Sequence, residues 1–146
     1  MGKYLIGLLA AGSMLAMVSL SATEVDGLQV IVNPANPVKS LPREEVSAFL
    51  LKKRTRWDNG EPVMPIDLIR ESPIRESFCK LIHRRSVKNI ETYWNRKIFT
   101  GDDVPPPRAQ SEREVIEYVA GHPGAIGYVS ASAPLSGVKP IEVEIE

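Results

Sequence analysis

The side chains best suited to chemistry in this sequence are one thiol and two imidazoles. Cys79 is the only cysteine of the 146 residues, and His83 and His122 are the only histidines. A nucleophilic thiol needs a neighbouring base, and a metal site needs several ligands at a characteristic spacing. Neither pattern occurs, and no hydrolase, phosphate-loop or dinucleotide-binding motif is present. The sequence therefore predicts no catalytic residue, no metal site and no cofactor, in a protein that is not an enzyme.

The setting of these residues favours structural roles. Cys79 lies between Phe78 and Lys80 in a helical pattern, so we expect it to be a buried small hydrophobic residue. His122 precedes Pro123-Gly124, which is typical of a turn.

Charge gives only a local indication of a partner. The chain has 18 basic and 18 acidic residues, so no overall field favours nucleic acid or an anionic membrane. One basic cluster stands between two predicted helices and comprises Lys80, His83, Arg84, Arg85 and Lys88. This cluster could contact an acidic partner or lipid headgroups, or it could be an ordinary solvated face.

The first residues have the pattern of an export signal. Lys3 provides a positive start, residues 5–20 are apolar, and the small residues Ser19, Ser21 and Ala22 follow. We expect a signal peptide over residues 1–22, cleaved after Ser21 or Ala22, and a periplasmic or secreted protein. The alternative is an uncleaved membrane anchor, although a bilayer span usually needs about 18 or more apolar residues.

Apolar and β-branched runs alternate with amphipathic runs along the remaining chain. We expect strands at residues 28–32, 62–68, 125–129 and 141–145, the last as a half-exposed edge strand or a tail. We expect helices after Ser40, Ser72, Ser86 and Ser111. Strands interleaved with helices predict an α/β fold with a partly parallel sheet.

Two tryptophans lead to different expectations. Trp94 shares an apolar stripe with Ile90 and Ile98, so core packing is its expected role. Trp57 lies beside the turn Asp58-Asn59-Gly60, where both packing and a contact with a ligand remain open.

Several strings occur in an order that resembles a known family. VIVNPANPVKSL, the turn Thr55-x-Trp57, SPIRESF and HPGAIGYV are similar to successive landmarks of the phosphate ABC transporter substrate-binding proteins, within the type 2 periplasmic binding proteins. The resemblance covers roughly Val25 to Ala131. It implies one lobe of a two-lobed α/β protein, with a mixed sheet flanked by helices, over residues 25–135. Residues 136–146 would then be a C-terminal edge strand or tail.

The resemblance also implies an anion site at the start of a helix. Ser72, Pro73 and Ile74 match the Ser-Gly-Thr of that family, and Arg70 and Arg75 lie nearby as candidate ligand-binding residues. Pro73 removes one amide donor, and Ile74 lacks a hydroxyl. Leu68 stands where the family tends to have an arginine, and Glu71 would repel a dianion.

From these features we expect an exported substrate-binding-like protein for phosphate or another oxyanion, associated with an ABC-type transport or sensing system. Its partners would be the anion and a membrane transporter or another periplasmic protein. The alternative is an interaction module that has kept the fold and lost the small ligand. Nucleic acid is not an expected partner.

Overall fold

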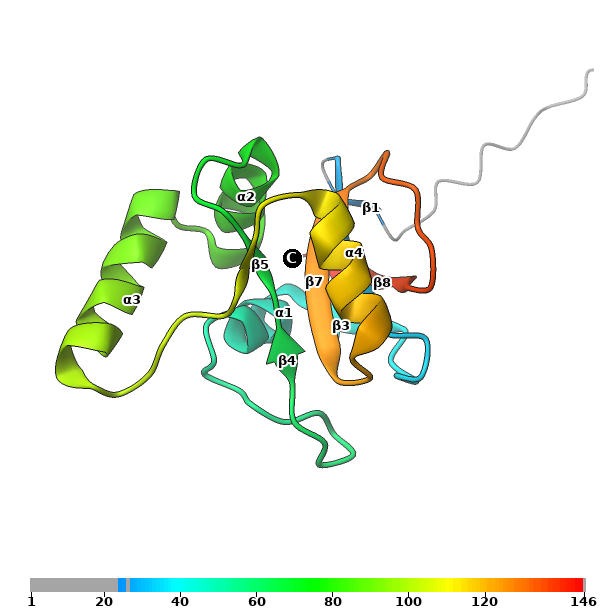
Figure 1. Cartoon of the computed structure of the whole chain (residues 1–146), viewed down its shortest axis with the longest axis horizontal. Helices are drawn as coiled ribbons and strands as arrows, with labels where there is room; N and C mark the ends of the chain where they lie inside the picture. Colours follow the sequence, from blue (N-terminus) through cyan, green and yellow to red (C-terminus); the bar gives the residue numbers. More distant parts are fainter. Residues whose placement is uncertain (1–23, 26, 146) are drawn as a thin grey trace, which may run out of the picture.

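The computed structural model describes residues 24, 25 and 27–145, so the predicted signal peptide lies outside the described residues. A mixed sheet forms the centre of the described part, and helices pack around it (Figure 1). The strands are β1 (Glu24–Val25), β2 (Leu28–Val32), β3 (Ser40–Pro42), β4 (Met64–Pro65), β5 (Asp67–Leu68), β6 (Arg108–Ala109), β7 (Ala125–Ser130) and β8 (Lys139–Glu144). The helices are α1 (Arg43–Leu50), α2 (Pro73–Phe78), the π-helix η1 (Cys79–His83), α3 (Val87–Thr100) and α4 (Glu112–Gly121).

The sheet is built around β2, whose five residues are all buried. Its strand order is β3-β8-β2-β7-β4, with β1 also paired to β2. β2 runs antiparallel to β7 and β8, with Val30 opposite Tyr128 and Ile141. β3 joins β8 and β4 joins β7 in parallel. The predicted α/β fold with a mixed sheet flanked by helices is confirmed.

Two strand predictions were wrong in detail. Residues 62–68 form two short strands in different sheets, because Ile66 N donates to Ile126 O while Asp67 N donates to Pro107 O, both at 2.9 Å. β8 is an interior strand rather than an edge strand or tail, because it pairs with β2 on one side and β3 on the other. Neither change of partner leaves a trace in local sequence patterns.

Aromatic residues fill the main core beside β7. The ring of Phe78 stacks on that of Tyr128, with centroids 3.8 Å apart and planes within 6°. Trp57 is buried, and its indole Nε1 donates to Gly124 O at 3.0 Å, so it serves packing in this structure.

A second, smaller core attaches α3 to the rest of the molecule. It contains Leu51, Cys79, Ile90 and Trp94, all buried. The predicted core roles of Cys79 and Trp94 are therefore confirmed. Ile98 does not continue the stripe, because this end of α3 passes beyond the core and leaves the side chain exposed.

The two glycines of the string HPGAIGYV stand where other parts of the chain approach closely. A Cβ atom on Gly124 would lie 2.3 Å from the carbonyl oxygen of Pro62. A Cβ atom on Gly127 would lie 2.8 Å from Val115 and 2.9 Å from Ile66. These glycines thus let β7 pack against α4 and the segment before β4.

Within the described residues, every helix is too short or too polar to cross a bilayer.

Candidate functional site

The start of α2 carries Ser72 in the role that its sequence pattern predicts. Its backbone is extended, and its Oγ accepts a hydrogen bond from the amide of Arg75 at 3.3 Å. Pro73 fills the first helical position, where no amide is needed. A cap of this kind stabilises a helix by about 1 kcal/mol. The hydroxyl of Ser72 is thus already used within the chain.

Two open hollows meet at Ser72 and have volumes of about 310 and 290 Å³. The first is lined by Arg70, Glu71, Ser72, Glu76, Lys80, Ser86, Val87 and Lys88. The second is lined by Leu68, Ile69, Glu71, Ser72, Pro73, Ile74, Gln110, Ser111 and Glu112. The structure therefore brings Ser72 and Arg70 together at one hollow.

Carboxylates weaken the attraction of these hollows for an anion. Glu71 lies on both, Glu76 on the first and Glu112 on the second. The Lys80 ammonium pairs with Glu76 at 3.5 Å. Arg70 and Lys88 supply the remaining positive charge of the first hollow.

Arg75, the third predicted ligand-binding residue, points into the interior and is 0 % exposed. Its Nη2 lies 2.7 Å from Glu91 Oε1, and its Nε lies 3.7 Å from Asp67 Oδ1. Arg108 approaches the same Glu91 oxygen at 2.9 Å. The charge of Arg75 is neutralised inside the molecule, away from the hollows at Ser72.

The carboxyl of Asp67 completes this buried network. Tyr128 donates its hydroxyl to Asp67, and the amide of Leu68 donates to the same oxygen. Burial raises the pKa of Asp67 against the opposing attraction of Arg75, and burial with the nearby Asp67 raises the pKa of Tyr128 well above its usual range. Sequence reasoning missed this network, although an aspartate inside the apolar run 63–68 was a possible signal.

Burial shifts the pKa values of two titratable side chains near this network. Burial, followed by the charge of Asp67, raises the pKa of Cys79 to about 12, so the thiol is protonated and unreactive at neutral pH. Burial, followed by the charges of Arg75 and Arg85, lowers the pKa of His83 to about 3. The Nδ1 atom of His83 lies 2.8 Å from Ser47 Oγ.

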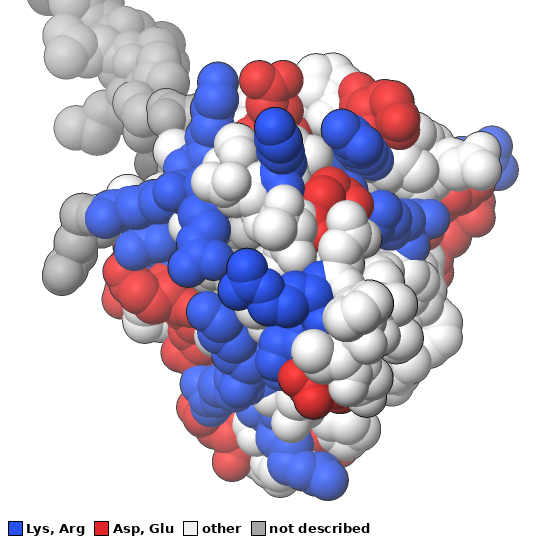
Figure 2. All heavy atoms as spheres, turned by 90° about the vertical axis from the view of Figure 1, so that its left-hand side faces the viewer, with Lys and Arg blue, Asp and Glu red and all other residues white. Residues whose placement is uncertain are grey.

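The predicted basic cluster is therefore smaller than its sequence suggests. His83 is buried, whereas Lys80, Arg84, Arg85 and Lys88 are exposed. Many Lys and Arg side chains gather on the side of the molecule shown in Figure 2.

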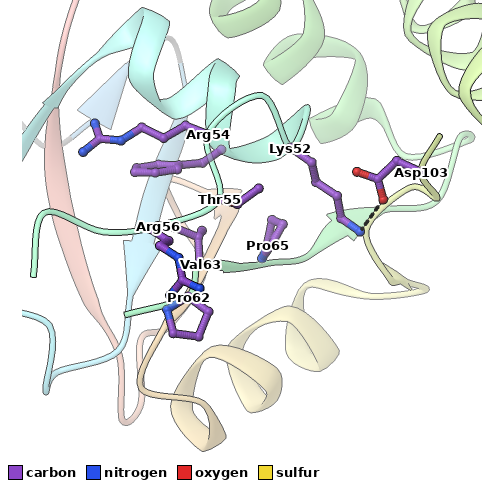
Figure 3. Close-up of a pocket in the computed structure, with 9 residues that line it drawn as sticks. Lys52, Arg54, Thr55, Arg56, Pro62, Val63, Pro65 and Asp103 are labelled. Carbon is purple, nitrogen blue, oxygen red and sulfur yellow. Dashed lines mark ion pairs between the residues drawn. The ribbon is translucent and has the colours of Figure 1, made fainter. Parts of the chain in front are cut away.

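A further hollow, of about 330 Å³, carries three cations that do not converge (Figure 3). Lys52 extends towards Asp103, and its Nζ lies 3.6 Å from Asp103 Oδ1. Arg54 points away from Asp103. Arg54 pairs with Glu45 and Asp58, and Arg56 Nη1 donates to Gly60 O at 2.8 Å. An anion at the centre of this hollow would meet cations that already have acceptors.

In the part of the chain that the structure describes, no group of three or more His, Cys, Asp or Glu residues is placed to hold a metal ion.

The solved structures that this chain resembles include phosphate transport receptors. An ABC-type phosphate transport receptor from Vibrio cholerae matches 80% of this chain with a TM-score of 0.64 and 24% identity. A putative phosphate ABC transporter substrate-binding protein with bound phosphate from Clostridium perfringens matches 80% of this chain, with a TM-score of 0.64 and 20% identity. PstS from Borrelia burgdorferi matches 80% of this chain, with a TM-score of 0.60 and 18% identity.

The chain spans about half the length of these proteins: 46%, 44% and 47% respectively. No family profile matches the sequence, and no curated protein does. The predicted resemblance is thus confirmed at the level of fold, as one lobe of a phosphate-receptor-like structure.

Proposed function

We propose that this chain is an exported, phosphate-receptor-like protein that works with an ABC-type transport or sensing system and meets its ligand through the surface around Ser72. The observation that carries this proposal is the structural match of 80% of the chain to phosphate transport receptors. Fold alone does not fix function, so the proposal also depends on Ser72 and Arg70 sharing one hollow.

The site geometry supports weak rather than tight oxyanion binding by the isolated chain. A tight small-molecule site buries most of its ligand, whereas both hollows at Ser72 are open. Glu71 and Glu76 oppose a dianion, and Arg75 is used internally. We expect phosphate and sulfate to bind in the millimolar range, near −4 kcal/mol.

Calorimetric titration of the mature protein with phosphate and sulfate tests this expectation. Millimolar binding that is lost in Arg70→Ala and weakened in Ser72→Ala would support a residual anion site. Ser77→Ala is the matched control, because Ser77 is an exposed serine in the same helix whose hydroxyl donates to Pro73 O. Binding tighter than about 10 μM, or −7 kcal/mol, would contradict the weak-site geometry.

A second candidate function is a protein interaction module that has kept the fold and lost the anion. The specific observation in its favour is the internal neutralisation of Arg75, together with the carboxylates Glu71, Glu76 and Glu112 around Ser72. Site-specific photo-crosslinking from position 74 in cells would capture a partner under this hypothesis. No heat with phosphate, together with such a crosslink, would favour this candidate over the first.

Export is tested separately from ligand binding. Fractionation of cells should recover the protein outside the cytoplasm, with a mature N-terminus at Ala22 or Thr23. Recovery of the full-length chain in the membrane fraction would instead support the uncleaved anchor.

A further inference from the structure

Three apolar side chains at the end of α3 and just after it are exposed. Phe99 is 92% exposed, Val104 60% and Ile98 51%. We call these three residues the α3 tip. α3 stands to one side of the sheet, and its C-terminal end points away from the rest of the molecule (Figure 1). An apolar group on a projection of this kind is typical of a surface that meets another phase or molecule.

Lysines lie on α3 before this tip and on the neighbouring segment 52–53. The ammonium groups of Lys53 and Lys97 lie 5.8 and 5.7 Å from the centroid of the Tyr93 ring, and Lys52 pairs with Asp103, directly before Val104. Figure 2 shows that Lys and Arg dominate much of this side of the molecule. Asp102 is an exposed carboxylate next to the tip and opposes the attraction of an anionic surface.

We propose that the α3 tip docks on an anionic lipid surface. Phe99, Ile98 and Val104 would enter the boundary between headgroups and acyl chains, while Lys53 and Lys97 would remain at the level of the lipid phosphates. A partly inserted apolar face flanked by lysines is the usual chemistry of interfacial binding, and lysine stems can stay in apolar surroundings while their ammonium groups reach the phosphates.

The observations favour lipid over a protein partner. The tip is a projection, and none of the hollows described above includes Ile98 or Phe99. Lys53, Arg96 and Lys97 supply positive charge around this end of α3, and a fluid layer of phosphates can meet such charges without a fixed geometry. The binding is peripheral and does not depend on the proposed oxyanion site.

Co-sedimentation of the mature protein with phosphatidylglycerol vesicles, compared with phosphatidylcholine vesicles, tests the proposal. We expect binding only to the anionic vesicles and a decrease with added salt. Phe99→Ala should weaken binding roughly ten-fold, because a large apolar contact is lost. Ile145→Ala is the control, since Ile145 is also exposed, at 41%, but lies beyond β8.

Charge variants test the second half of the proposal. Lys53→Ala and Lys97→Ala should each weaken binding about five-fold, whereas Lys39→Ala, in the exposed loop before β3, should have little effect. Asp102→Asn should strengthen binding. Thermal unfolding should be unchanged in the exposed variants at Lys39, Lys53 and Asp102, and the same measurement on Lys97→Ala, whose side chain is half-buried, separates a loss of binding from a loss of fold.

Insertion is distinguished from adsorption by fluorescence. Brominated lipids should quench the tryptophan fluorescence of the Phe99→Trp variant more than that of the wild type, whose Trp57 and Trp94 are buried. The proposal is overturned if Phe99→Ala binds vesicles like the wild type, or if the tryptophan at position 99 is not quenched. It is also overturned if crosslinking from position 99 captures a protein while vesicles do not bind. The phosphate titration contains no lipid, so the two proposals fail independently.

Discussion

At the scale of single residues, Arg75 shows how a local pattern and the folded environment can assign different roles. It follows a helix cap in sequence, close to the expected anion position, yet it is completely buried between Glu91 and Asp67. Its partners come from α3 and β5, and these elements meet only in the folded chain. Its contribution is therefore to join elements rather than to present charge at the surface.

Removal of Arg75 should strongly destabilise the protein. Arg75→Ala leaves Asp67 and Glu91 buried with less compensating charge, and breaking a buried ion pair in this way costs about 3–5 kcal/mol. Urea unfolding followed by circular dichroism measures the loss. Arg70→Ala is the control, because Arg70 is exposed and its loss should stay within about 0.5 kcal/mol. Equal effects of the two variants would contradict the internal role of Arg75.

His83 should make stability depend on pH on the acidic side. Its pKa falls from an ordinary value of 6.5 to about 3 in the folded protein, so the unfolded chain binds more protons between these values. Stability is therefore complete above pH 6.5 and is lost as the pH falls towards 3, by up to about 1.4 kcal/mol per pH unit. Urea unfolding at pH 7.0, 5.5 and 4.5 should show this slope, and His83→Gln should flatten it. A variant with the full wild-type slope would assign the pH dependence to other groups.

The residue roles that the sequence predicted are those with short-range causes. Ser72, Ser86 and Ser111 each accept from an amide three residues ahead, a contact that needs only the local chain. The interior placement of Arg75 and His83 depends on partners from distant segments, so residue type and spacing gave a solvent-facing interpretation instead.

At the scale of elements, the junction between β7 and the segment before β4 depends on a close backbone approach at Gly124. The carbonyl of Gly124 accepts from Met64 N at 2.9 Å and from the indole of Trp57 at 3.0 Å. A strand of ordinary residues could not bring the backbone of Pro62 so near.

Gly124→Ala should therefore separate these two segments. The added methyl group would lie 2.3 Å from Pro62 O, and overpacking of this kind costs about 1–3 kcal/mol. Near-ultraviolet circular dichroism should also report a changed environment of Trp57.

Gly121→Ala provides the opposite expectation within the same loop region. No atom lies within 4 Å of the added carbon, and the site is the last residue of α4. Alanine should be neutral or stabilising by up to about 1 kcal/mol. If both glycine variants lose the same stability, close approach is not the reason for Gly124.

Element type was easier to predict from the sequence than element pairing. Periodicity correctly indicated β2, β7 and the helices, because each pattern is set by the element's own residues. It could not indicate that the chain changes sheets between Ile66 and Asp67, or that Val30 pairs with Ile141, since neither has a local signature.

At the scale of the whole molecule, the described chain corresponds to slightly less than half of the phosphate receptors that share its fold. Its core is nevertheless continuous from β2 through β8, with Ile141 at 0% exposure and Val143 at 6%. Part of the interior of the described residues thus comes from β8.

The contribution of β8 to the whole core can be measured directly. Ile141→Ala should cost about 2–5 kcal/mol, because it creates a cavity beside β2. Ile145 directly follows β8 and is exposed, so Ile145→Ala should change the free energy of unfolding by less than about 0.5 kcal/mol. Similar values for the two variants would mean that β8 is not an integral part of the core.

The interior place of β8 has a consequence for biosynthesis. β3 is linked to β2 only through β8, although β2 and β3 are neighbours in sequence. Until residues up to Glu144 have been synthesised, β8 cannot take its place between β2 and β3. We therefore expect β3 to join the sheet only after β8 has been synthesised.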